Sequence, residues 1–182
     1  MIGSIQIVRW KADDHTVLRV ADVKTPWGTA LVVMHDASIV EWWFSTFEAS
    51  RLALTLRWPH AQWLEDDSSV IKMVEAIFSA DSIVDIHVAL KGTDFQFGVW
   101  QALMTIPSGS VATYADVARS IGRATAVRAV ANAIGQNPVS YLVPCHRVVR
   151  TNGSLGGYRW GNTVKAQLLQ HEKALTNFAL SF

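Results

Sequence analysis

The chain has 182 residues, of which 50% are hydrophobic and 17% charged, with a formal net charge of +1. These proportions exclude wholesale disorder, and no apolar run approaches the roughly 20 residues of a membrane-spanning helix. The single cysteine, Cys145, excludes an internal disulfide and a multi-cysteine zinc cluster. The first residues lack the basic start and long apolar stretch of a secretory signal. We therefore expect a cytoplasmic protein with no membrane segment.

The two halves of the chain carry opposite charge. Residues 1–90 hold seven basic and twelve acidic residues, net −5, and residues 91–182 hold nine and three, net +6. A basic half is typical of a domain that meets a polyanion, although compositional drift between two domains explains the same numbers. Because the pattern changes around Lys91, we predict one domain over residues 1–91 and a second over residues 92–182.

The first half predicts an α/β domain without a strong chemical signature. Short β-branched segments between turns predict strands, and apolar residues at helical spacing predict helices. We expect strands at residues 16–21, 28–34, 38–44 and 84–90, and helices at residues 48–57 and 68–79. The histidines of this half are too scattered to bind a metal; they are His15, His35, His60 and His87. We expect no metal and no cofactor.

The second half predicts mainly helices. Thr93 or Asp94 can cap a helix that ends before Pro107. Thr113 opens another helix, which Gly122 ends. A further helix over residues 126–134 follows after a tight turn, so this pair of helices forms a helix-turn-helix pattern.

The helix predicted over residues 126–134 has two unlike faces. The face expected to point to the core consists of Val127, Val130, Ala131 and Ile134. The outer face consists of Arg128, Ala129, Asn132, Ala133 and Gly135. A helix that reads base edges needs several long polar side chains, so this bare face predicts docking on DNA without sequence selection. Packing of an Ala-rich helix against another element is the alternative.

Cys145 has neighbours that are typical of a reactive cysteine. Pro144 interrupts a predicted buried strand over residues 139–143, and His146 and Arg147 follow the cysteine directly. Cationic neighbours favour the nucleophilic thiolate, which makes up only ~3% of an unassisted thiol with a pKa of ~8.5 at pH 7. The alternative is an inert cysteine packed as a small hydrophobe.

A carboxylate on the predicted C-terminal helix, over residues 163–175, can support a base at His146. Glu172 shares an otherwise apolar face with Val164, Leu168 and Leu175. A buried carboxylate needs a partner, and His146 provides one. This predicts that Cys145, His146 and Glu172 act as nucleophile, base and orienting group.

Two alternatives stay open for these residues. Glu172 could be exposed at the helix end and paired with Lys165 or Lys173. Cys145, His146 and His171 could instead bind a metal, although their spacing is not a recognised one.

The segment Pro144-Cys145-His146-Arg147-Val148 resembles the active-site motif of the O6-alkylguanine-DNA alkyltransferases, or methylated-DNA–protein-cysteine methyltransferases. Matching segments extend in order over about residues 92–173, with weaker likeness over residues 17–91. They are Phe95-Gln96, Val99-Trp100, Ile106-Pro107, Thr113-Tyr114, Arg128-Ala129-Val130, Asn137-Pro138, Gly157-Tyr158-Arg159-Trp160-Gly161 and Lys165 to Glu172. The Gly-Tyr-Arg-Trp-Gly version is similar to the bacterial Ada and Ogt type.

The resemblance implies a ribonuclease H-like α/β domain followed by a mainly α winged helix-turn-helix domain. It also implies suicidal DNA repair. Cys145 takes the alkyl group from O6-alkylguanine, and from O4-alkylthymine, in double-stranded DNA after base flipping, and stays alkylated. The protein would then be a single-turnover S-methyltransferase without a cofactor, and we expect a monomer.

The resemblance also implies roles for individual residues. His146 deprotonates Cys145 through a water, and Glu172 orients His146. Tyr114 protonates the departing guanine. The residues expected to bind substrate or DNA are Arg128, which fills the gap left by the flipped nucleotide, Asn137, which braces the site loop, and Arg147, Val148, Tyr158 and Arg159.

Departures from relatives sharpen this expectation. Because the sequence holds one cysteine, we expect neither the structural zinc that N-terminal cysteines bind in some relatives nor the cysteine-rich domain of Ada proteins. Alkyltransferase-like lesion sensors carry tryptophan at the position of Cys145. The rival hypotheses are a non-catalytic winged-helix lesion sensor or transcription regulator, and a cysteine hydrolase.

Overall fold

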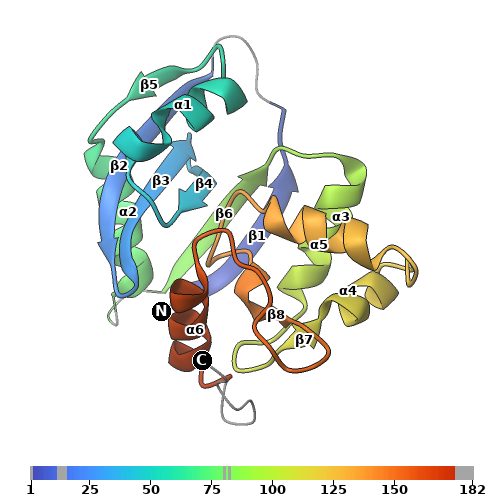
Figure 1. The fold of residues 1–182 in the computed structure, drawn as a ribbon. Coiled ribbons are helices and arrows are strands. Elements are labelled where there is room, and N and C mark those ends of the chain that lie inside the picture. Colours follow the sequence, from blue (N-terminus) through green and yellow to red (C-terminus); the bar gives the residue numbers. More distant parts are fainter. Residues whose placement is uncertain (1, 12–15, 80, 82, 175–182) are drawn as a thin grey trace. The chain divides into compact units, whose positions relative to one another are not determined.

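The computed structural model describes residues 2–11, 16–79, 81 and 83–174 (Figure 1). The chain divides into two compact units, Met1–Lys91 and Gly92–Phe182. His15 and Leu175, which entered the predictions above, lie outside the described residues. In the described part, no helix is long and apolar enough to cross a membrane. Strands and helices occur in both units, so the expectation of an α/β chain is confirmed.

The first unit is built on a six-stranded mixed sheet in the order β1-β6-β4-β3-β2-β5. Its strands are β1 Ile2–Arg9, β2 Val17–Thr25, β3 Gly28–His35, β4 Ser38–Trp43, β5 Gln62–Leu64 and β6 Val84–Leu90. Strands β2, β3 and β4 are antiparallel neighbours, whereas β1 with β6, β4 with β6 and β2 with β5 are parallel. The four predicted strands are confirmed, β6 with the predicted bounds and the other three with shifted ends, and β1 and β5 were not predicted.

The two helices of the first unit pack against this sheet. Helix α1 (Phe47–Arg57) contacts β2, and α2 (Ser68–Phe78) contacts β2 and β3. Thr46 caps α1 and Asp67 caps α2, each through a side-chain oxygen that accepts a backbone N–H of the first turn. Both predicted helices are confirmed.

A carboxylate lies fully buried in the core of the first unit. Glu41, on β4, accepts hydrogen bonds from the indole nitrogens of Trp43 (2.9 Å) and Trp58 (3.0 Å) and forms an ion pair with Arg57. Burial raises the pKa of Glu41, whereas the Arg57 charge lowers it. The carboxylate is therefore compensated by three donors within its own unit.

The second unit is mainly helical, with a short strand pair. Its helices are α3 Asp94–Met104, α4 Tyr114–Ser120, α5 Val127–Gly135 and α6 Asn162–His171, and a 3₁₀ turn, η1, covers Cys145–Arg147. The strands β7 (Ala112–Thr113) and β8 (Val148–Val149) pair in parallel. Helix α3 contacts α4 and α5, and α6 contacts η1. This packing fixes η1 between elements that are far apart in the sequence.

Local signals set the start of two of these helices. The side chains of Thr93 and Thr113 each accept a hydrogen bond from the backbone N–H of the third helical residue. In return, the side chains of these third residues, Gln96 and Asp116, accept a hydrogen bond from the backbone N–H of the capping threonine. Gly122, with φ +68°, takes the left-handed conformation directly after α4. The predicted helices and their caps are confirmed.

The predicted strand over residues 139–143 is wrong. This segment is buried, as expected, but its N–H groups form turns, with Val143 N donating to Val139 O at 3.0 Å. The side chain of Asn137 accepts from Val139 N and donates to Val143 O, which closes the loop on itself. The Asn137 side chain thus forms hydrogen bonds with backbone groups that, in a β-strand, would bond to a neighbouring strand.

The two faces predicted for α5 also need correction. Val130, Ala133 and Ile134 are buried, whereas Val127 and Ala131 are half-buried and line a pocket. Ala133, expected on the outer face, instead packs inward, and its carbonyl accepts a hydrogen bond from Trp100 Nε1 at 2.9 Å. Small side chains contribute little to a hydrophobic pattern, so the pattern assigned the buried face of the helix to a slightly wrong set of residues.

Candidate functional site

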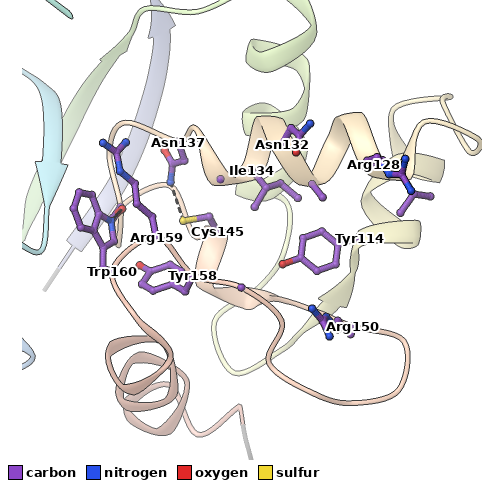
Figure 2. A pocket seen from close by; sticks show the side chains of 15 residues that line it. Tyr114, Arg128, Asn132, Ile134, Asn137, Cys145, Arg150, Tyr158, Arg159 and Trp160 are labelled. Atoms are coloured by element: carbon purple, nitrogen blue, oxygen red, sulfur yellow. Dashed lines mark hydrogen bonds between the residues drawn. The ribbon is translucent and has the colours of Figure 1, made fainter. Parts of the chain in front are cut away.

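A pocket of about 680 Å³ lies in the second unit, a size typical of small-molecule sites. Helix α5 forms one wall and the segment at residues 157–160 forms another, with the sulfur of Cys145 between them (Figure 2). The lining residues are Tyr114, Val127, Arg128, Ala131, Asn132, Ile134, Gly135, Asn137, Ser140, Cys145, Arg150, Gly157, Tyr158, Arg159 and Trp160. Six of the ten predicted site residues are among them.

Cys145 opens η1 at the base of this pocket. Its side chain is buried but lines the cavity, and the residue is 6% exposed. Asn137 Nδ2 donates to Sγ at 3.1 Å and to Val143 O at 2.8 Å (Figure 2). One amide therefore braces the loop before the cysteine and places a donor on the sulfur.

The electrostatics around Cys145 differ from the sequence expectation. Burial raises the pKa of the Cys145 thiol, and the Asn137 donor and the Lys165 charge oppose that rise. The prediction that Arg147 favours the thiolate is wrong, because its guanidinium is bound to Glu172 instead. The cation that acts on the sulfur comes from α6, twenty residues further along the chain.

His146, Arg147 and Glu172 form one cluster behind the cysteine. His146 Nε2 donates to Glu172 Oε1 at 3.0 Å, and Arg147 donates from Nε (2.9 Å) and Nη2 (2.8 Å) to the two carboxylate oxygens. These donors lower the pKa of Glu172 to about 2, against the rise that burial alone causes. The predicted contact between His146 and Glu172 is confirmed, and the alternative pairing of Glu172 with Lys165 or Lys173 is wrong.

The protonation of His146 follows from this cluster. A carboxylate can only accept, so Nε2 carries a proton, and burial lowers the pKa of His146 and favours the neutral ring. In the neutral ring, Nδ1 is then an acceptor. This atom is buried and bonds to none of the described residues, so it is available to take a proton.

Tyr114 and Arg128 lie on the side of the pocket away from Arg159 and Trp160 (Figure 2). Tyr114 opens α4, and burial raises the pKa of its phenol. Gly156 has a φ of +71°, and a Cβ there would lie 3.1 Å from the Tyr114 hydroxyl, so glycine is required for this approach. Arg128 is exposed and forms no hydrogen bond or ion pair with any described residue.

The opposite wall is held by side chains that the sequence reasoning placed only in part. Burial raises the pKa of Tyr158 well above its usual value. Trp160 Nε1 donates to Ser140 Oγ at 2.6 Å, and the guanidinium of Arg159 lies 4.8 Å from the Trp160 ring centroid. The predicted Val148 is buried beside the site and offers its carbonyl to Lys165 rather than to the pocket. These contacts fix the shape of the wall.

The sequence reasoning missed Lys165 as a site residue, although a signal was present. Lys165, Leu168, Leu169 and Glu172 follow the i, i+3, i+4, i+7 spacing of one helix face. Two charges of opposite sign on one apolar stripe indicate that both are buried near partners. Within the described part of the chain, no three side chains of the metal-binding types come together, so the alternative metal site with His171 has no geometric support.

Together, the fold and the site define a class of protein that presents one thiol at the base of a pocket beside a pair of helices joined by a tight turn. Comparison with known proteins agrees. The model of the 6-O-methylguanine DNA methyltransferase DNA-binding domain matches residues 94–174. The crystal structure of the Mycobacterium tuberculosis O6-methylguanine methyltransferase matches with a TM-score of 0.69 and 33% identity, over 91% of this chain and 96% of that one.

Two relatives in sequence extend the comparison. An inducible methylated-DNA–protein-cysteine methyltransferase of Bacillus subtilis is 42% identical over 121 residues, which cover 64% of this chain and 68% of that protein. The regulatory protein Ada of Salmonella typhimurium is 50% identical over 103 residues, which are 57% of this chain but 29% of that protein. The chain belongs to the methylated-DNA–protein-cysteine methyltransferase family, as its motifs predicted.

Proposed function

We propose that the protein repairs DNA by moving the alkyl group of O6-alkylguanine, and of O4-alkylthymine, irreversibly to Cys145. The observation that carries this proposal is the position of the Cys145 sulfur at the base of a pocket of about 680 Å³. A duplex hides guanine O6 in its stack, so the alkylated base is flipped into the pocket at a cost of a few kcal/mol. Each chain acts once, without a cofactor.

The chemistry is an in-line displacement. The thiolate of Cys145 forms a bond to the alkyl carbon while the bond from that carbon to O6 breaks, and the electron pair leaves with the guanine. His146 accepts the thiol proton through a water, with Nδ1 as the acceptor that the geometry makes available. Glu172 orients His146, and Tyr114 supplies the proton that the guanine ring nitrogen gains.

The DNA contacts follow from the walls of the pocket. Helix α5 docks on DNA with its small residues, and Arg128, which has no partner in the described part, enters the stack where the flipped base was. Asn137 braces the loop, and Tyr158 and Arg159, which line the pocket, bind the base, whereas the Val148 carbonyl is taken by Lys165. Arg147, which is not among the residues that line the pocket, acts through Glu172. Phosphate contacts make the affinity fall with salt.

The same proposal assigns the two units. The first is a ribonuclease H-like domain, and the second is a winged helix-turn-helix domain whose α4–α5 pair meets DNA. Support comes from the M. tuberculosis relative solved in complex with DNA, which is 34% identical with a TM-score of 0.68 over 87% of this chain and 93% of that one. A monomer in the cytoplasm stays our expectation.

The test is a mass measurement. The protein is incubated with duplex DNA that holds one O6-methylguanine, and the expected product is one added methyl group per chain, located on Cys145 by peptide mapping. Cys145→Ala is the matched control and gains none. The proposal is overturned if the wild-type chain gains no methyl group and the DNA still holds O6-methylguanine.

Two rival functions predict other outcomes. A non-catalytic lesion sensor or regulator keeps its full biological activity in Cys145→Ala, and a regulator also selects a preferred DNA sequence. A cysteine hydrolase turns over an ester or amide many times. Stoichiometric inactivation by a free O6-alkylated guanine excludes the hydrolase.

A further inference from the structure

Helix α6 carries a lysine that the mechanism above does not use. Lys165 is 0% exposed, although lysine is almost never fully buried unless it is paired. Its Nζ donates to Val148 O at 2.6 Å and to Leu155 O, and no carboxylate of the described residues forms an ion pair with it. The ammonium therefore has hydrogen-bond acceptors but no fixed counter-charge, an arrangement that is costly in a core.

The titratable groups around this ammonium come from two segments. Cys145 and His146 on η1, and Arg150 after β8, are the groups that interact with it electrostatically. Arg150 repels the ammonium, and neutral His146 cannot compensate it. Cys145 can become negative, and its attraction opposes the lowering of the Lys165 pKa, which burial brings to about 8.

The same pair is seen from the side of the sulfur. Lys165 is the positive charge that lowers the pKa of the Cys145 thiol, alongside the hydrogen bonds from Asn137 and Tyr158. Tyr114 and Tyr158 also face the sulfur, but burial raises the pKa of both phenols, so neither competes as an anion. Both residues are buried, on the two elements α6 and η1 that pack against each other, and each favours the charged form of the other.

We propose that Lys165 is a positioning residue for the alkyl transfer, acting as the built-in counter-charge of the Cys145 thiolate. This inference rests on the proposed function for the reaction, but the ion pair itself is tested without DNA. It has a second consequence. Alkyl transfer turns the thiolate into a neutral thioether, so the reacted protein keeps a buried ammonium with no anion beside it.

The first experiment measures the rate at which iodoacetamide labels Cys145 as a function of pH. Lys165→Met keeps the length of the side chain and removes the charge, so we expect the midpoint of the profile to rise by a unit or more, with labelling near pH 7 about tenfold slower. Lys173→Met, which removes an exposed lysine from the same unit, keeps the wild-type profile. Superimposable profiles for wild type and Lys165→Met would overturn the proposal.

A second experiment covers the case in which Lys165→Met does not fold. In the wild-type protein, the ¹³Cε resonance of Lys165 is titrated before and after iodoacetamide has converted Cys145 into a neutral thioether. We expect the pKa of Lys165 to fall by a unit or more on labelling, because the counter-charge is gone. An unchanged Lys165 titration would overturn the proposal without any variant.

The DNA reaction separates this inference from the proposed function. If both hold, Lys165→Met slows methyl transfer most at low pH and recovers at high pH, where the thiolate forms unaided. If the wild-type chain takes no methyl group from O6-methylguanine DNA while the iodoacetamide profile still depends on Lys165, the proposed function fails and the ion pair stands. If methyl transfer occurs and its pH profile ignores Lys165, the inference alone fails.

Discussion

Among the described residues, each of the two units buries one formal charge completely, Glu41 in the first and Lys165 in the second, and the surroundings of these two charges differ. Glu41 of the first unit lies at the centre of three donors, one of them the guanidinium of Arg57. Lys165 of the second unit donates to two backbone carbonyls and pairs with no carboxylate of the described residues; its proposed counter-charge is the Cys145 thiolate, which alkyl transfer removes. A buried charge with permanent partners, such as Glu41, stabilises one arrangement of the core. A buried charge whose counter-charge depends on the state of a reactive group, as proposed for Lys165, changes its energy when that group reacts.

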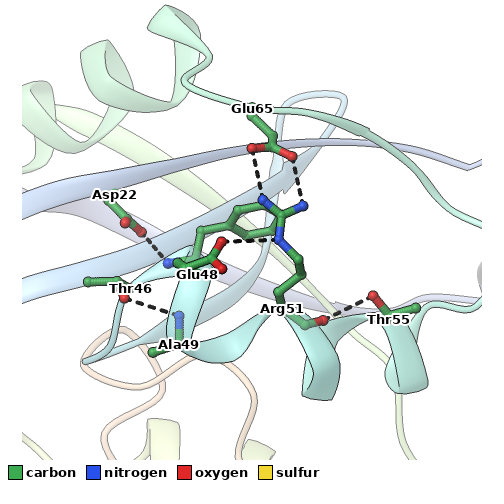
Figure 3. Close-up of polar contacts among 8 residues, drawn as sticks. Asp22, Thr46, Glu48, Ala49, Arg51, Thr55 and Glu65 are labelled. Carbon is green, nitrogen blue, oxygen red and sulfur yellow. Dashed lines mark hydrogen bonds and ion pairs between the residues drawn. The ribbon is translucent and has the colours of Figure 1, made fainter.

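The arginines repeat this contrast. In the first unit, Arg51 bridges Glu65 and Glu48 on the surface of α1 (Figure 3), and Arg57 pairs with the buried Glu41. In the second unit, Arg128 at the pocket has no partner among the described residues. These arginines of the first unit are therefore paired with carboxylates of the same unit, whereas Arg128 of the second unit is available to bind a ligand. Four predictions, made on three variants, test this difference, and the variants are taken in order of decreasing effect on stability.

The largest effect is expected from Glu41→Ala. It leaves the Arg57 charge and two indole N–H groups without their acceptor in the core, and breaking such a buried pair typically costs about 3–5 kcal/mol. Denaturant unfolding followed by tryptophan fluorescence measures the loss in the first unit. Glu48→Ala, which breaks an exposed pair with Arg51, is the control and costs far less. Equal losses in the two variants would mean that the Glu41 network is not structural.

The second prediction concerns acid. Because the pKa of Glu172 is held at about 2, below its ordinary 4.5, the ionised carboxylate stabilises the fold above pH 4.5 by about 3 kcal/mol. That stability is lost as the pH falls from about 4.5 to about 2, where the folded protein also takes up the proton. Unfolding free energies measured over this range should show the loss in wild type and not in Glu172→Gln.

The same variant has a readout at the sulfur. Glu172→Gln loosens the hold on His146, so we expect the pKa of the Cys145 thiol to rise in the iodoacetamide profile. A variant that titrates like wild type at the thiol, while it loses acid-dependent stability, would make Glu172 purely structural.

The smallest effect on stability is expected from Arg128→Ala, which removes a side chain without partners among the described residues and should change the unfolding free energy by less than about 0.5 kcal/mol. Its effect should appear in repair. Methyl transfer from a paired duplex should slow more than transfer from a mismatched site, where the stack is already weak. Arg123→Ala, exposed between α4 and α5, is the matched control. Equal slowing on both substrates would contradict the role of Arg128 in the stack.

Sequence reasoning predicted best what depends on neighbours along the chain. The caps at Thr93 and Thr113 and the glycine after α4 need only local geometry, and all three are confirmed. It failed where distant segments decide. The apolar residues 139–143 correctly indicated burial, but the side chain of Asn137 turned them into a loop rather than a strand.

The same limit explains the candidate site. The contact between His146 and Glu172 was predicted because a buried carboxylate demands a partner. Arg147 was assigned to Cys145 from adjacency alone, but a 3₁₀ turn points consecutive side chains in different directions, and the guanidinium reached Glu172. The helical spacing of Lys165, Leu168 and Glu172 indicates that the lysine is buried, but its place near the sulfur depends on the packing of α6 on η1, which no local pattern encodes.

The sulfur at the base of the pocket offers one more use. Cys145 is the chain's single thiol, and only 6% of the residue is exposed. A series of alkylating reagents of increasing girth should therefore label it in order of size, and the girth at which labelling stops gauges how wide the entrance becomes through thermal motion. Since every molecule holds one such thiol, the fraction of labelled chains at a given time measures how often the pocket entrance admits a reagent of that size.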